Sequence, residues 1–146
     1  MLKNKKILFS LPFITIGIIM LFLGLRWMTI DEPWMLDKVA NEERLNMSFD
    51  QLFEPAINST LPGYLKQIYR FFGLWVVSIG LFILSFSKPK LIENRKTRFS
   101  LLLCVGIMIY SALLLAYALI PSSPFIYLGW LFLILHSTSI WNYRKF

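Results

Sequence analysis

The sequence has one cysteine, one histidine and none of the common catalytic motifs. Cys104 lies in an apolar run, which excludes an intrachain disulfide, a Cys-x-x-Cys pair and a thiolate metal cluster. His136 has no cysteine or carboxylate three or four residues away, so the spacing of a zinc site is missing. Walker, Gly-x-Ser-x-Gly, His-Glu-x-x-His and dinucleotide-binding motifs are also absent. We therefore expect no metal and no cofactor, and the sequence leans away from an enzyme.

Charge is scarce as well. Only 16% of the 146 residues are charged and 57% are hydrophobic, with a mean hydropathy of +0.62. This composition lies outside the range of water-soluble domains, so lipid must be the solvent for most of the chain. The net charge of +7 would suit nucleic acid, but the basic residues lie beside long apolar runs and form no aromatic-interleaved polar face. We expect a membrane protein that contacts the lipid bilayer and no nucleic acid.

Four apolar runs are long enough to cross a bilayer. Each has about the 20 residues that an α-helix needs to cross roughly 30 Å of hydrocarbon. None alternates apolar and polar residues as barrel strands do, so helices must satisfy the backbone groups in lipid. The sequence predicts an all-α fold, a four-helix up-down bundle that forms one membrane domain over residues 1–146. Its spans are about 7–30, 65–87, 99–120 and 125–143, with an outer loop at 31–64 and an inner loop at 88–98.

Lysine and arginine predict the orientation. Of the 15 such residues, ten lie near the N-terminus, in the loop 88–98 and in the C-terminal tail, and five lie on the opposite side. Because basic residues collect on the cytoplasmic side, we expect a multi-pass protein of the cytoplasmic (inner) membrane with both termini in the cytoplasm. The first run begins with lysines, as a secretory signal does. Its apolar core is too long for a signal and no small-x-small cleavage site follows, so we expect an uncleaved helix.

The outer loop 31–64 is acidic and patterned for short helices. It holds seven of the eight acidic residues of the chain and only two basic ones. Asp31 followed by Pro33 predicts a helix start with Asp31 as the N-cap. A second short helix is expected near 48–53, ended by Pro55. We thus expect an acidic extracytoplasmic loop that contains short helices, opposite a basic inner face.

Glycines recur at a spacing of seven in the first two spans. Gly17 and Gly24 lie on one face of the first span, and Gly73 and Gly80 lie on one face of the second. Helices in lipid associate where small residues let the backbones approach, so these four residues predict that the first two helices pack together. The alternative is that glycine is simply common in membrane helices.

Two arginines lie at the outer ends of the first two spans. If those helices are neighbours, Arg26 and Arg70 approach each other near the outer interface. They could hold Asp31, Glu32 or another loop acid, or bind an anionic lipid head group or a carboxylate ligand. The alternative needs no ligand: both side chains extend to the interface and form a structural salt bridge to the loop.

His136 is an ionisable residue inside the fourth span. Such a group at membrane depth is a candidate functional residue, because its burial is costly. Hydroxyl residues follow it at 137–139, so hydrogen bonds between helices explain it as well. No carboxylate lies in the middle of any span, which argues against a proton-coupled transporter and against acid–base catalysis by Asp or Glu.

The segment 69–81 reads Tyr-Arg-Phe-Phe-Gly-Leu-Trp-Val-Val-Ser-Ile-Gly-Leu. Together with four helices and a long first outer loop, it resembles the DoxX-like group of small bacterial membrane proteins, whose members often carry an arginine and glycines here. The resemblance implies an inner-membrane protein of quinone- or redox-associated membrane complexes. The sequence itself shows no cofactor ligand set.

Three functions are compatible with these features. The first is a non-enzymatic protein whose acidic loop and outer arginines contact a lipid, a membrane protein partner or a second copy of the chain. The second is a membrane-embedded binding site for a small hydrophobic molecule such as a quinone or lipid, lined by Arg26, Arg70, Trp75 and His136. It requires a cavity on the order of several hundred Å³. The third is a small transporter subunit.

Overall fold

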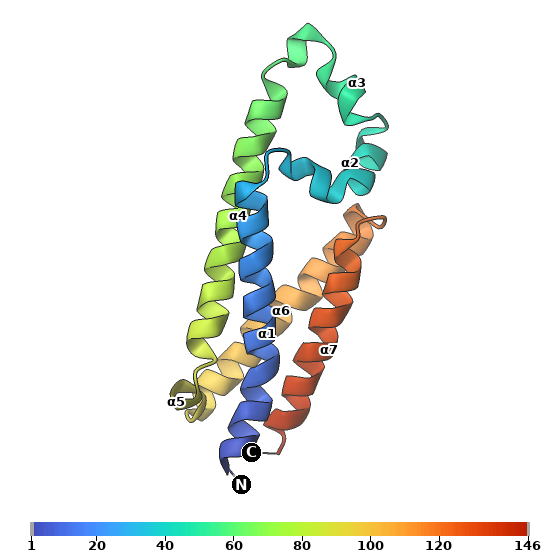
Figure 1. The fold of residues 1–146 in the computed structure, drawn as a ribbon. Coiled ribbons are helices and arrows are strands. Elements are labelled where there is room, and N and C mark those ends of the chain that lie inside the picture. Colours follow the sequence, from blue (N-terminus) through green and yellow to red (C-terminus); the bar gives the residue numbers. More distant parts are fainter. Residues whose placement is uncertain (1, 146) are drawn as a thin grey trace.

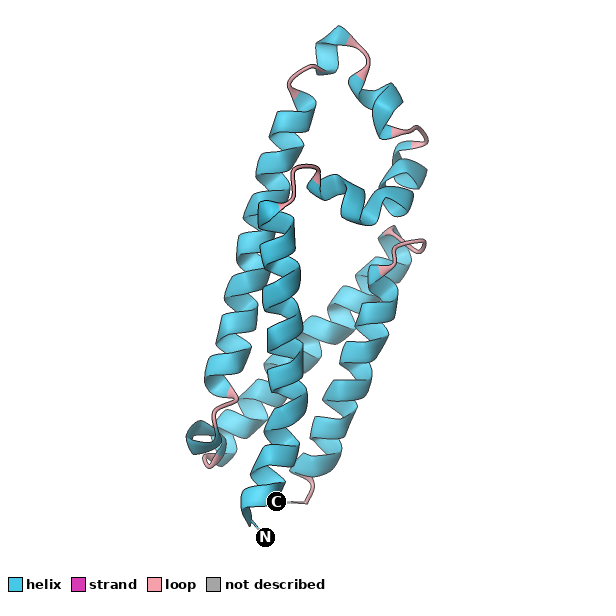
Figure 2. Ribbon diagram, in the orientation of Figure 1, coloured by secondary structure: helices cyan, strands magenta, loops and turns pink. Residues whose placement is uncertain are grey.

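The computed structural model of the protein describes residues 2–145, and the side chains of residues 5–145. The expected all-α class is confirmed, because the described residues form helices and no strand (Figures 1 and 2). Four helices are long and apolar enough to cross a membrane. They are α1 (Leu2–Thr29), α4 (Leu61–Phe86), α6 (Arg95–Leu119) and α7 (Phe125–Tyr143).

Three of the long helices begin before the apolar runs do. α1 begins at Leu2, α4 at Leu61 and α6 at Arg95, where the apolar runs predicted starts near 7, 65 and 99. The added residues of α1 and α6 are mostly polar, whereas those of α4 are Leu61, Pro62, Gly63 and Tyr64. At the start of α6 the Asn94 side chain accepts a hydrogen bond from the backbone N–H of Lys96 at 2.8 Å, which caps the helix.

α1 is the central helix. It packs along α4 on one side and along α7 on the other, while α6 packs on α7. Consecutive long helices run in opposite directions, and α6 crosses behind α1 at an oblique angle (Figure 1). The start of α1, the end of α7 and the short helix α5 (Pro89–Ile92) lie at the same end of the molecule (Figure 1). We call this end, with the loop 88–98, the basic end. Residues 31–60 lie at the other end, which we call the acidic end.

The backbones of α1 and α4 touch at four glycines. A Cβ atom added to Gly24 would lie 2.6 Å from the carbonyl oxygen of Gly73, and a Cβ at Gly73 would lie 2.6 Å from the oxygen of Gly24. Nearer the basic end, a Cβ at Gly80 would lie 2.9 Å from the oxygen of Gly17, and one at Gly17 would lie 3.1 Å from the oxygen of Gly80. Any larger residue would have to displace the opposing backbone, so this contact is specific to glycine.

The hydrophobic core lies toward the basic end. Ile92 of α5 is fully buried there, so this short helix closes the end of the core. The aromatic rings of Phe9 and Phe13 lie 5.3 Å apart at its centre. The buried cluster draws on α1, α4, α5 and α6 and contains Phe9, Phe13, Ile16, Met20, Ile83, Ile92, Leu101, Leu102, Val105 and Ile109.

The acidic end is a folded unit. After α1 the chain forms two short 3-10 helices and two short α-helices, in the order η1 (Pro33–Asp37), α2 (Lys38–Leu45), α3 (Phe49–Phe53) and η2 (Ala56–Asn58). Trp34 packs against Phe49 and Phe53, with ring centroids 6.2 and 5.6 Å away. Trp34 and Phe49 are buried, so these helices have a small core of their own. We call residues 31–60 the outer cap.

The second short helix lies where the sequence predicts it, as α3 at Phe49–Phe53, whereas the predicted cap of the first differs. Ser48 caps α3: its hydroxyl accepts from the Gln51 backbone N–H, and the Gln51 side chain accepts from the Ser48 N–H. Asp31 is not an N-cap, which corrects that expectation. Glu32 holds the N-cap position of η1 and makes no side-chain capping bond. The Asp31 carboxylate is instead paired with Lys66.

Candidate functional site

Lys66 holds the Asp31 carboxylate. Its Nζ donates to Asp31 Oδ1 at 2.8 Å. This hydrogen bond and the charge of Lys66, with a smaller effect of Arg70, lower the pKa of Asp31 below its usual value. The Asp31 side chain is 91% exposed, so solvent screens the pair and it stabilises the fold little. The cation that meets the acidic loop is therefore Lys66, and Arg70 acts on Asp31 only through its charge.

The outer residues that the sequence singled out share no hydrogen bond or ion pair within the described part of the chain. Arg26 and Arg70 are both exposed, and neither side chain forms a hydrogen bond or ion pair with a described residue. Glu32 is exposed as well. Trp75 is 57% exposed and packs edge-on against Phe71, with ring centroids 5.9 Å apart. None of these residues lines either of the two cavities described below.

The outer cap is fixed to the long helices by polar contacts. The Asn41 side-chain amide donates to the Trp34 carbonyl at 3.0 Å and to the Tyr69 hydroxyl of α4 at 3.1 Å. The Ser122 hydroxyl, in the turn between α6 and α7, donates to the carboxylate of Glu43 on α2. The cap thus bridges α4 and the α6–α7 turn, as the position of α2 above that turn indicates (Figure 1).

A second carboxylate of the cap meets the same turn. Burial raises the pKa of the Asp37 carboxyl, and a hydrogen bond with Ser123 opposes that shift without cancelling it. Sequence reasoning identified neither this contact nor the one between Glu43 and Ser122. The signal was present, because a turn of four residues, Pro121 to Pro124, holds two hydroxyls opposite an acidic loop.

His136 lies at the contact of α7 with α6 and is buried. Its Nε2 lies 3.0 Å from the Leu102 carbonyl oxygen, and its Nδ1 lies 3.5 Å from the Tyr110 hydroxyl. Because a carbonyl only accepts, we assign the proton to Nε2, which leaves Nδ1 to accept from Tyr110. The ring also packs edge-on against Phe13, with centroids 6.2 Å apart. Both ring nitrogens are therefore partnered across the α6–α7 contact.

Glycines make room for this contact. A Cβ atom at Gly106 of α6 would lie 2.8 Å from His136 Cε1, so the imidazole fills the space that a side chain would take. In the reverse sense, a Cβ at Gly129 of α7 would lie 2.7 Å from Leu113 Cδ1 of α6. Each helix thus accepts a side chain of the other. Sequence reasoning missed both positions. Each is a glycine in a span made mostly of large residues, which could have indicated a close helix contact.

Asn142 supplies the hydrogen bond that Pro12 removes from α1. Pro12 has no backbone N–H, so the carbonyl of Leu8, four residues earlier, lacks its partner within the helix. The Asn142 side-chain amide donates to that carbonyl at 3.2 Å, and the Ser139 hydroxyl donates to the neighbouring Phe9 carbonyl at 3.3 Å. Polar residues of α7 therefore satisfy backbone groups of α1, as a helix in lipid requires.

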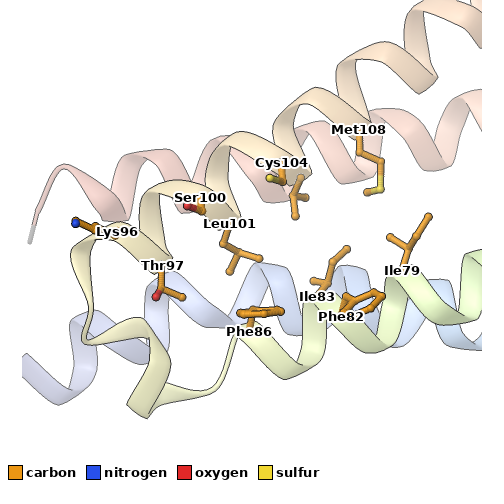
Figure 3. A pocket seen from close by; sticks show the side chains of 11 residues that line it. Ile79, Phe82, Ile83, Phe86, Lys96, Thr97, Ser100, Leu101, Cys104 and Met108 are labelled. Carbon is orange, nitrogen blue, oxygen red and sulfur yellow. The ribbon is translucent and has the colours of Figure 1, made fainter.

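Two cavities lie along α6. The first is a groove of about 490 Å³ between α4 and α6, and the second measures about 370 Å³ beside His136. Residues of the groove are Ile79, Phe82, Ile83 and Phe86 of α4 with Lys96, Thr97, Ser100, Leu101, Cys104, Val105 and Met108 of α6 (Figure 3). The second is lined by Leu102, Leu103, Gly106, Ile107, Tyr110, Ser111 and His136.

The polar residues of the described chain are dispersed. No group of three His, Cys, Asp or Glu side chains gathers among the described residues where it could hold a metal ion. His136 contacts a carbonyl and a hydroxyl. In the cap, Asp31, Glu42 and Glu43 contact a lysine, a backbone amide and a hydroxyl. No protein-family model, curated protein or solved structure matches the chain. The likeness to the DoxX-like group therefore stays a proposal that rests on segment 69–81 and the layout of four helices.

Proposed function

We propose that the protein is a non-enzymatic membrane protein that binds a partner protein through its outer cap. Its four long helices would cross the cytoplasmic membrane as an up-down bundle, with the basic end and both termini in the cytoplasm. The excess of lysine and arginine at that end supports this orientation. The observation that carries the proposal is the outer cap itself, a folded and anchored unit that presents unpaired acids.

The outer cap is built to hold one shape. Besides its aromatic core, the Phe49 backbone N–H donates to the Glu42 carboxylate at 3.0 Å, and Lys38 lies 3.7 Å from the same carboxylate. The contacts of Asn41 and Glu43 then fix the cap to α4 and to the α6–α7 turn. A loop that only joined two spans would need none of these bonds. A fixed surface is what specific recognition requires, because less conformational freedom is lost on binding.

The acids that do not hold the cap together face outward. Asp50 and Glu54 are four residues apart, are exposed, and form no ion pair within the described residues. Ile57, three residues after Glu54 in the chain, is 90% exposed, so the same part of the cap also presents an apolar side chain. This chemistry fits a partner protein that presents a basic surface around an apolar contact. A membrane complex of this kind also agrees with what the DoxX-like resemblance implies.

The other functions receive different support. A quinone-type site lined by Arg26, Arg70, Trp75 and His136 is not favoured, because only His136 lines a cavity described here. A transporter subunit is not favoured either, since the ionisable His136 is engaged by Leu102 and Tyr110. A hydrophobic ligand has one specific observation in its favour, the groove between α4 and α6.

Reversing the exposed acids of α3 tests the partner proposal. In the double variant Asp50→Lys/Glu54→Lys, partner yield in quantitative cross-linking of intact membranes should fall at least about tenfold, because two attractive contacts become repulsive. The matched control is Glu93→Lys, which makes the same acid-to-lysine change at the basic end, keeps the sign of the charge excess there and should leave the cross-linked partner unchanged. Equal partner yields from wild type and the α3 variant, both expressed and folded, would overturn the proposal.

A further inference from the structure

The groove between α4 and α6 is polar at one end and apolar along the rest, as a phospholipid is. We propose that it binds one anionic phospholipid, with an acyl chain along the apolar wall and the phosphate at Lys96. This inference does not depend on the partner proposal, because the groove lies among the long helices and away from the outer cap (Figures 1 and 3). It assigns a lipid site to a surface that the sequence pattern did not single out.

The wall of the groove is apolar along most of its length. Phe82 is 65% exposed and Phe86 is half exposed, although both face toward α6 in the groove (Figure 3). Polar residues lie at the basic end, where Lys96, Thr97 and Ser100 occupy the first turns of α6. A lipid has the same order, with a charged head group followed by a hydrocarbon chain.

The length of the groove matches one leaflet. Its lining runs along α6 from Lys96 to Met108, which at 1.5 Å per residue corresponds to about 18 Å. Half of the roughly 30 Å hydrocarbon core of a bilayer is about 15 Å. An acyl chain that starts at Lys96 would therefore end near Met108, close to the middle of the membrane.

The charge at the mouth selects an anionic head group. The one acid of this loop, Glu93, forms an ion pair with Lys6, with Nζ and Oε1 2.7 Å apart. The Arg98 guanidinium donates to the carbonyls of Ile92 and Glu93. Lys96 lines the groove, and three further cations lie in the adjacent loop and at the start of α6, namely Lys88, Lys90 and Arg95. All four are exposed and form no ion pair within the described residues. Their charge complements a phosphate, and the hydroxyls of Thr97 and Ser100 add donors.

Cys104 offers a direct readout, because it is the only cysteine, is exposed and lines the groove. The full chain in mild detergent is alkylated with N-ethylmaleimide in the presence of phosphatidylglycerol or of phosphatidylcholine with the same acyl chains. Phosphatidylglycerol should slow alkylation about fivefold more than phosphatidylcholine, the effect of one lysine at an anionic head group. Lys96→Gln should abolish this difference, whereas Lys145→Gln, a change at the same end but outside the groove, should keep it.

Native mass spectrometry gives a second readout. The wild-type chain should retain one phosphatidylglycerol, and Cys104→Trp, which fills the groove, should lose it. Equal protection by the two lipids, or none by either together with unchanged retention by Cys104→Trp, would overturn the proposal. Protection that rises with protein concentration in the absence of added lipid would assign the groove to a second copy of the chain instead, and would overturn it too.

Discussion

Replacing Gly24 with isoleucine is expected to separate α1 from α4 and to lower the free energy of unfolding by about 3 kcal/mol. Even the first added carbon would lie 2.6 Å from the Gly73 carbonyl oxygen and 2.7 Å from the Val77 backbone nitrogen, so no side-chain rotation can relieve the clash. Equilibrium unfolding in mixed micelles measures the loss. Tryptophan fluorescence reports it, because Trp27 packs 4.9 Å from the Phe72 ring of α4.

Gly63→Ala is the matched control, because it also lies in α4. No heavy atom lies within 4 Å of a Cβ at this position. Alanine is favoured over glycine in a helix, so this variant should be neutral or more stable by about 0.5–1 kcal/mol. If Gly24→Ile unfolds at the same denaturant concentration as Gly63→Ala, the close contact of α1 and α4 is wrong.

The second large effect is a coupling between Gly106 and His136. Gly106→Ala in the wild-type chain should lower the free energy of unfolding by about 2 kcal/mol, because the new Cβ would lie 2.8 Å from the imidazole. His136→Ala should cost about 2 kcal/mol as well, since it leaves a void and removes the bonds to Leu102 and Tyr110. In the double variant the alanine at 106 occupies the vacated space. The two losses of unfolding free energy should therefore not add, and a double-mutant cycle should show a coupling of about 2 kcal/mol.

Losses of unfolding free energy that add in the double variant would contradict this contact.

Partner cross-linking separates the structural role of His136 from a functional one. Folded His136→Ala protein should cross-link to its partner as the wild type does, because the imidazole lies between α6 and α7 and the outer cap does not use it. A folded variant that has lost the partner would give His136 a role in binding.

The positions of the long helices follow from the sequence alone, because the length and apolarity of the four runs allow little else. The spacing of seven also marks Gly17, Gly24, Gly73 and Gly80, and the structure places all four where α1 meets α4. The pattern is informative here because both helices repeat it, so one register brings every glycine opposite another.

Helix geometry does not favour the predicted pairing of Arg26 with Arg70, which stays a prediction. Residues of an α-helix advance by about 100° each, so Arg26, two residues after Gly24, lies about 200° away from the face that meets α4. It therefore lies on the side of α1 opposite the glycine contact with α4. The helical periodicity that identified the glycine contact thus argues against a shared arginine site.

Other contacts depend on how separate helices meet. The pairing of Asn142 with Leu8 needs α1 and α7 to be neighbours, although Pro12 signals that a carbonyl is left free. The groove depends on the oblique path of α6, which contacts α7 over much of its length and α4 only near the basic end. Hydrophobic periodicity within one helix predicts neither the contact of Asn142 with Leu8 nor the groove.

The claim on which both proposals depend is that the outer cap and the basic end lie on opposite faces of one membrane. Two single-cysteine variants in a Cys104→Ser background test it, with Ser59→Cys in the cap and Lys90→Cys in α5, both at exposed positions. Intact cells are treated with a membrane-impermeant maleimide. We expect cysteine 59 to be labelled at once and cysteine 90 only after the membrane is opened. Labelling of both residues in intact cells, or of cysteine 90 alone, would contradict the account.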